Sequence, residues 1–312
     1  QIPFFMPAYV TVRTEPPPAC ALIALTRSRD GVNRKYVGTF CDYYSTIFCY
    51  MSFWVMIGGA ASTLNQEYGL PNWAGAVILT ILTTITVVGG LNSLVDAIGV
   101  VGPIIVVLCI FIGLVTVIQD AGNIPAGLEV IRTGAYAGAA EGETIKNAGA
   151  NWFISAASYA GFVLLWFASF TAALGSKNKK KDLNYGIVGG TVAVCVAIAL
   201  ISFGQIANIN TPLEDGSAYV WNADIPNLIL AMKIWKPFSA IFAIVVFAGI
   251  YTTAVPLLYN PASRFAKEGT SRFKILTVVL AVVGLIVGLF LPFRTLVNVI
   301  YVLNGYVGAV LI

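Results

Sequence analysis

The stretch FSAIFAIVVFAGIYTTAVPLL, residues 238–258, runs for 21 residues without a charged side chain. A helix needs about 20 apolar residues to cross the roughly 30 Å hydrocarbon core of a bilayer. The run is continuously apolar and does not alternate with polar residues, which favours a helix over a barrel strand. This stretch therefore predicts a transmembrane helix.

Similar apolar runs lie on both sides of this stretch. The chain is 58% hydrophobic and only 10% charged, whereas about a quarter of the residues in a soluble domain are charged. It lacks the polar side chains that would cover a water-facing surface. We therefore predict an all-α polytopic transmembrane bundle of about eight spans, at residues 43–64, 73–88, 97–118, 152–174, 185–206, 238–258, 275–291 and 296–312.

The basic residues between these spans collect in alternate loops. One set comprises Arg27, Arg29, Arg34, Lys35, Lys177, Lys179, Lys180, Lys181, Arg264, Lys267, Arg272 and Lys274. The other set comprises Arg132, Lys146, Lys233, Lys236 and Arg294. Positive residues accumulate on the cytoplasmic side of membrane proteins. The first set is therefore predicted to face the cytoplasm. Together with the apolar spans, this predicts a multi-pass protein of the cell membrane.

Residues 1–42 do not read as a complete span. Pro3, Pro7 and the prolines at 16–18 break a helix there, and Arg13 and Glu15 interrupt the apolar residues. We interpret residues 1–42 as an atypical leader and residues 43–312 as the transmembrane domain. Because the chain begins at Gln1 and ends inside an apolar run, we also interpret it as a fragment or a processed form.

Several classes of function are disfavoured by the residues that are absent. The chain has no histidine, and its five cysteines form no C-x-x-C pair, so the usual metal ligands and Ser-His or Cys-His pairs are missing. Asp96 and Arg294 lie at the ends of spans, and no acidic or basic residue lies mid-membrane. A net charge of +4, divided among loops, does not indicate nucleic-acid binding. We therefore expect neither an enzyme nor a bound cofactor.

Two threonines within residues 238–258 form the sharpest polar cluster. Thr252 and Thr253 offer hydroxyl oxygens, which are hard ligands suited to a small cation such as Na⁺. Pro256 has no amide hydrogen to donate to the carbonyl of Thr252, which leaves that oxygen free as a third ligand. The alternative is that each threonine bonds the carbonyl four residues before it and binds no ion.

A run of small residues, SAASYAG at 155–161, marks the span at 152–174. Such a run can break a helix at mid-depth and present backbone groups to a ligand, as discontinuous helices do in transporters. The alternative is close packing of this helix against a neighbour.

The order of these features resembles a known family over residues 43–312. The residues that carry the likeness are Gly58-Gly59-Ala60-Ala61 before Leu70-Pro71, then Gly89-Gly90-Leu91, Asn151-Trp152, and Ile250-Tyr251-Thr252-Thr253-Ala254-Val255. In these residues the chain is similar to the YkvI-type bacterial membrane proteins, a branch of the amino acid–polyamine–organocation superfamily with a LeuT-like fold of inverted repeats.

The resemblance implies roles for particular residues. The eight spans would be the third to tenth helices of the family, and its first two helices have no recognisable counterpart here. Thr252 and Thr253 would then lie on the eighth helix as sodium ligands. Ser158, Tyr159 and Gly161 would lie near the break in the sixth helix, and Tyr50 on the third helix would face the same substrate cavity.

The expected function is secondary active transport by alternating access. The resemblance and the Tyr-Thr-Thr cluster favour Na⁺-coupled symport, in a lipid bilayer, of a small neutral or zwitterionic solute such as an amino acid. The alternative is a receptor or scaffold that has kept the fold and does not transport, as in the germinant receptors of the same superfamily.

Overall fold

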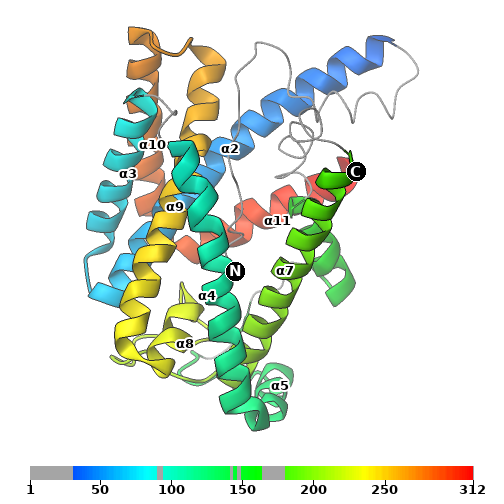
Figure 1. Ribbon diagram of the computed structural model, residues 1–312, viewed down its shortest axis with the longest axis vertical. Helices are drawn as coiled ribbons and strands as arrows, with labels where there is room; N and C mark the ends of the chain where they lie inside the picture. Colours follow the sequence, from blue (N-terminus) through cyan, green and yellow to red (C-terminus); the bar gives the residue numbers. More distant parts are fainter. Residues whose placement is uncertain (1–30, 90–93, 141–142, 146–148, 164–179, 312) are drawn as a thin grey trace.

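A computed structural model describes residues 31–89, 94–140, 143–145, 149–163 and 180–311 of the chain, and it is all-helical (Figure 1). The elements are α2 (Gly31–Tyr68), α3 (Asn72–Gly89), α4 (Leu94–Asp120), η1 (Ala121–Asn123), α5 (Ile124–Thr133), α7 (Lys180–Ala207), α8 (Pro226–Ile234), α9 (Lys236–Phe265), α10 (Ser271–Phe290) and α11 (Phe293–Leu311). A further apolar helix covers Trp152–Val163. The described β-structure is one isolated bridge between Pro212 and Tyr219.

Six of the described helices are long and apolar enough to cross a membrane. They are Thr46–Tyr68, Asn72–Gly89, Val101–Thr133, Val188–Ala207, Lys236–Phe265 and Ser271–Phe290. The multi-pass helical character predicted from the sequence is confirmed at this level. Two of the eight predicted spans are not among the six. The span predicted at 152–174 is described only to Val163, and α11 carries Arg294, Asn298 and Asn304 among its apolar residues.

The first described helix begins earlier than the predicted span at 43–64. It starts at Gly31, so the last residues of the predicted leader are helical, while residues 1–30 lie outside the described part of the chain. No proline lies between residues 31 and 68, and nothing in the local sequence stops the helix before Gly69. Gly69 has a φ of 66°, the left-handed geometry that commonly ends a helix.

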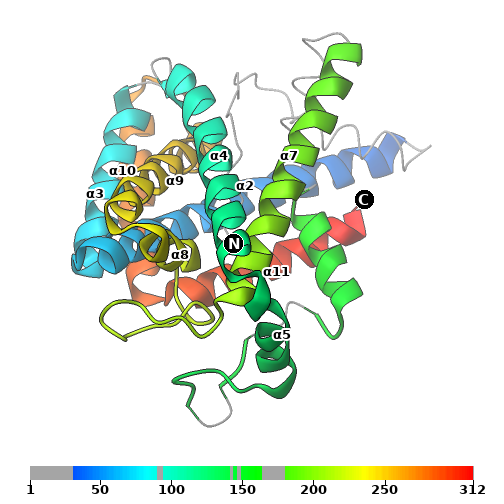
Figure 2. The same cartoon turned by 60° about the horizontal axis from the view of Figure 1, so that its bottom comes forward.

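Four helices, α2, α3, α9 and α10, each contact the other three and form the core of the bundle. Glycines bring them close together. A Cβ on Gly75 of α3 would lie 2.9 Å from the Cα of Ala61 on α2, and one on Gly284 of α10 would lie 2.8 Å from the Phe53 ring. Small residues at helix contacts allow this approach in membranes. Outside this core, α4 packs on α7 (Figure 2).

The two ends of the bundle differ in their charged residues. One end, here called the α8 end, carries α5, α8 and the loop at 208–225, which lie at the bottom of Figure 1. Lys233 of α8 bonds Asp120 of α4 at 2.7 Å, and Asn208 donates to the same carboxylate at 2.9 Å. These bonds tie α4, α7 and α8 together. The opposite end holds the α9–α10 connection, and Arg264, Lys267, Arg272 and Lys274 lie in it or in the adjoining turns of the two helices.

Impermeant thiol labelling should assign these ends to the two sides of the membrane. In a background without the native cysteines, we expect Lys267→Cys to react only from the cytoplasm and Asp215→Cys only from outside. Both positions are exposed, and the basic bias predicts this orientation. Labelling of both cysteines from one side of intact cells would contradict the predicted topology. Labelling after detergent treatment controls for reactivity.

Candidate functional site

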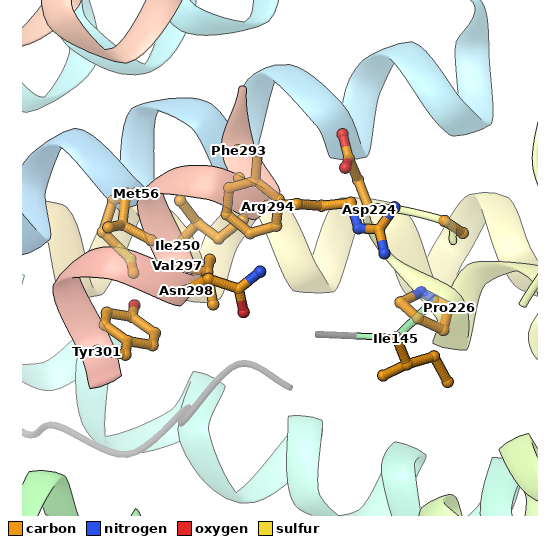
Figure 3. Close-up of a pocket in the computed structure, with 13 residues that line it drawn as sticks. Met56, Ile145, Asp224, Pro226, Ile250, Phe293, Arg294, Val297, Asn298 and Tyr301 are labelled. Carbon is orange, nitrogen blue, oxygen red and sulfur yellow. The ribbon is translucent and has the colours of Figure 1, made fainter. Parts of the chain in front are cut away.

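A pocket of about 150 Å³ lies between α2, α9, α11 and the loop that precedes α8 (Figure 3). It is set into the α8 end of the bundle. Its lining combines apolar side chains with a small number of polar ones, as ligand sites in proteins commonly do. The lining residues are Val55, Met56, Gly59, Ile145, Ala223, Asp224, Pro226, Ile250, Phe293, Arg294, Val297, Asn298 and Tyr301.

The wall formed by α2 depends on two adjacent glycines. A Cβ on either Gly58 or Gly59 would lie 3.2 Å from the Phe293 ring of α11. Without side chains at these positions, the ring rests directly on the α2 backbone and holds the start of α11 against it. The Gly-Gly-Ala-Ala sequence therefore takes part in two helix contacts. Gly58 and Gly59 contact α11, and Ala61 contacts Gly75 of α3.

The loop above the pocket is held on α2 by side-chain hydrogen bonds. Gln66 donates to the carbonyl of Ile225 at 2.8 Å and accepts from the Ile225 amide at 3.1 Å. Ser62, one turn earlier, donates to Oδ2 of Asp224 at 2.6 Å. These three bonds fix the Asp224 carboxylate at the pocket wall.

The wall formed by α11 presents one helical face to the pocket. Arg294, Val297, Asn298 and Tyr301 follow the i, i+3, i+4, i+7 spacing of a single face. Among the described residues, neither the Arg294 guanidinium nor the Asn298 amide has a hydrogen-bond or ion-pair partner. In Figure 3 the Arg294 side chain extends toward the loop of Asp224 and Pro226. Its donors are therefore available to a ligand.

Aromatic contacts lie between the pocket and the opposite end of the bundle. The Tyr301 ring packs on Phe162 with a centroid distance of 4.5 Å, and Phe162 meets Phe48 edge-on at 6.1 Å. One turn beyond Tyr301, Asn304 accepts a 2.6 Å hydrogen bond from the Tyr44 hydroxyl. These contacts pack the Tyr301 side of the pocket against the helix at Trp152–Val163 and against α2.

The predicted sodium ligands lie on α9 but do not line this pocket. Thr252 and Thr253 are both buried, and both hydroxyls donate to the Gly249 carbonyl at 2.9 Å. Thr253 thus bonds the carbonyl four residues before it, as the alternative interpretation expects, and Thr252 bonds the one three residues before it. Each oxygen still keeps lone pairs for a cation. The helix continues through Pro256, and proline lacks the amide that would bond the Thr252 carbonyl.

The break predicted near Ser158 and Gly161 is wrong for the described residues, because 152–163 form a continuous helix. The small residues instead pack against α11. The Ser158 hydroxyl faces the Val302 carbonyl at 3.4 Å, and a Cβ on Gly161 would clash with the backbone at Gly305 and Ala309. Close helix packing, the alternative, accounts for these residues. Tyr159 is 45% exposed and is absent from the pocket lining.

Tyr50, predicted to face the substrate cavity, is turned toward α10. Its hydroxyl donates to the Leu280 carbonyl at 2.8 Å, and its ring meets Trp54 edge-on at 5.2 Å. The pocket is lined instead by Val55, Met56 and Gly59 of the same helix. None of the predicted substrate residues lines the pocket.

The polar residues of the pocket were not singled out from the sequence as site residues. Asp224 reads as one acidic residue of a long loop, and Arg294 as a charge in the link before the last span. The signal that the sequence does carry is the pair Arg294 and Asn298, four residues apart on one face of a mostly apolar helix.

Known proteins give no independent assignment of this site. No family model, no curated protein and no solved structure matches the chain. The function is therefore inferred from the geometry of the pocket and of the helices that form it.

Proposed function

We propose that the protein is a secondary active transporter that carries a small neutral or zwitterionic solute across the cell membrane by Na⁺-coupled symport. The observation that carries this proposal is the pocket itself. It is a cavity with polar groups among membrane-length helices, and one of its lining residues, Tyr301, packs on a further aromatic ring. A polar site within such a bundle, flanked by packed side chains, is compatible with alternating access around a central site.

The arrangement of the core helices also supports the proposal. The α2–α3 hairpin turns at the α8 end, through residues 69–71, whereas the α9–α10 hairpin turns at the opposite end, through residues 266–270. The two hairpins thus run in opposite directions and pack together as the core. Paired segments of opposite direction are expected of the inverted repeats on which many transporters are built.

A sodium site on α9 completes the proposed mechanism. Thr252 and Thr253 present two hydroxyl oxygens and the Thr252 carbonyl on one stretch of helix, in the same element that brings Ile250 to the pocket. Hydroxyl and carbonyl oxygens suit a hard cation. Because both sites would involve α9, a movement of this helix would affect both.

The direct test is uptake into vesicles that contain the purified protein. An inward Na⁺ gradient should drive the accumulation of a labelled neutral amino acid, and replacing Na⁺ by K⁺ should abolish it. Binding of the amino acid without any flux would overturn transport and favour the receptor alternative. Vesicles that lack the protein control for leakage.

Replacing the proposed ligands should weaken activation by Na⁺. Thr252→Val and Thr253→Val keep the side-chain volume but remove an oxygen, so each should raise the Na⁺ concentration for half-maximal uptake at least about tenfold. The measurement is the Na⁺ dependence of initial uptake rates at fixed amino-acid concentration.

Thr277→Val is the matched control for these variants. Thr277 on α10 is fully buried, and its hydroxyl donates to the Phe273 carbonyl at 2.9 Å, four residues before it. The control loses the same kind of local hydrogen bond but no proposed ligand. If all three variants kept the wild-type Na⁺ dependence, the sodium site would be refuted.

A further inference from the structure

We infer that the pocket binds a small zwitterionic amino acid with an aliphatic side chain, with the carboxylate at Arg294 and Asn298 and the ammonium at Asp224. This inference deepens the proposed transport function, on which it rests for the role of the pocket in uptake. It follows from the charges of the pocket, the partners of its polar groups and its size.

The carboxylate end is defined by two donors on one face of α11. The guanidinium of Arg294 and the amide of Asn298 both line the pocket, and neither has a partner among the described residues. A guanidinium presents its N–H groups in a planar fork that matches the two oxygens of a carboxylate. Leaving such a charge unpaired at a pocket wall is costly unless water or a ligand bonds to it.

The ammonium end is defined by Asp224 on the opposing loop. Ser62 occupies Oδ2 of its carboxylate, whereas Oδ1 has no hydrogen-bond partner among the described residues. The Gln66 bonds to Ile225 hold the neighbouring backbone in place, so the free oxygen is held in place at the wall. Asp224 and Arg294 do not form an ion pair with each other, which leaves both charges to be matched by one ligand with two opposite charges.

The apolar part of the lining limits the size and polarity of the ligand's side chain. Val55, Met56 and Ile250 form an apolar wall from α2 and α9, and Val297 extends it on α11. The volume of about 150 Å³ is below the roughly 300–1,000 Å³ of pockets that hold drug-sized ligands, which favours a small ligand. A small aliphatic side chain fits this wall, whereas a second charged group would find no partner there.

The first arm of the test uses the unaltered protein in lipid nanodiscs and charge-deleted analogues. Labelled L-alanine should bind, and unlabelled L-valine should compete for it. L-Alaninamide lacks the carboxylate and propionate lacks the ammonium, so each should compete at least about tenfold more weakly than L-alanine. This arm needs no variant and therefore does not depend on how a substitution folds.

The second arm assigns each charge of the ligand to its partner. Arg294→Gln and Asp224→Asn should each weaken L-alanine binding at least about tenfold. Arg294→Gln should also remove the preference for L-alanine over L-alaninamide, and Asp224→Asn should remove the preference over propionate. Arg132→Gln and Asp215→Asn, exposed at the same end of the bundle, are the matched controls and should bind as the wild type does.

Several outcomes would overturn the inference. These are no binding of L-alanine, equal competition by the charge-deleted analogues, or pocket variants that bind like their controls. Its failure can be told apart from failure of the proposed function by flux. Na⁺-driven uptake that is insensitive to Arg294→Gln and Asp224→Asn would refute the site and keep transport. Binding that depends on both residues without any flux would keep the site and refute transport.

Discussion

Phe53→Ala should lower the free energy of unfolding by about 3 kcal/mol, the lower end of the range for buried phenylalanines. Phe53 on α2 is completely buried, and its ring fills the space over Gly284 of α10. Removing the ring leaves a cavity between two core helices that their rigid backbones cannot close. The lower end applies because lipid chains are as apolar as the core, so the loss comes from packing contacts.

The measurement is equilibrium unfolding in mixed detergent micelles. Phe290→Ala is the matched control, because Phe290 lies on α10 as well and is 82% exposed. It should change the stability by less than about 0.5 kcal/mol. Equal effects of the two substitutions would contradict the core that α2 and α10 form.

Gly113→Val should separate α4 from α7 and lower the free energy of unfolding by about 2–3 kcal/mol. A Cβ on Gly113 would lie 2.7 Å from the backbone at Leu200 and Ile201 of α7. Backbone atoms of a helix cannot rotate away as a side chain can. The helices must therefore move apart, which also strains the bonds that join Asp120 to Asn208 and Lys233 at their shared end.

Gly186→Val tests whether this cost comes from packing or from the substitution itself. Gly186 lies on α7 and has no heavy atom within 4 Å of the position of a Cβ. The same substitution there should leave the midpoint of unfolding unchanged or slightly raised, since glycine is a poor helix former. A large loss at Gly186, or none at Gly113, would be inconsistent with the described α4–α7 contact.

The helices could be predicted from the sequence because the signal for them is local. Runs such as residues 238–258 are apolar over the length that a bilayer requires, and the structure has helices at these places. The ends of the helices were predicted less well. Apolar composition does not mark where a helix stops, and α2 extends beyond the predicted span at both ends.

The predicted roles of small and polar residues depended on their neighbours. The small residues SAASYAG at 155–161 are compatible either with a helix break or with close packing. They pack against residues of α11 that lie more than 140 positions away in the sequence. Tyr50 was predicted to face a substrate cavity, whereas its hydroxyl donates a hydrogen bond to the Leu280 carbonyl. A local sequence specifies which groups are polar, but it does not specify what they face.

The local sequence is enough to predict an all-helical protein with several helices long and apolar enough to cross a membrane, because length and hydropathy act through the immediate surroundings of each residue. The meeting of Asp224 and Arg294 at one pocket depends instead on tertiary contacts. That arrangement requires Phe293 to rest on Gly58 and Gly59 and requires Gln66 to hold Ile225. These contacts join segments far apart in the chain, and their formation depends on shape complementarity across the whole bundle.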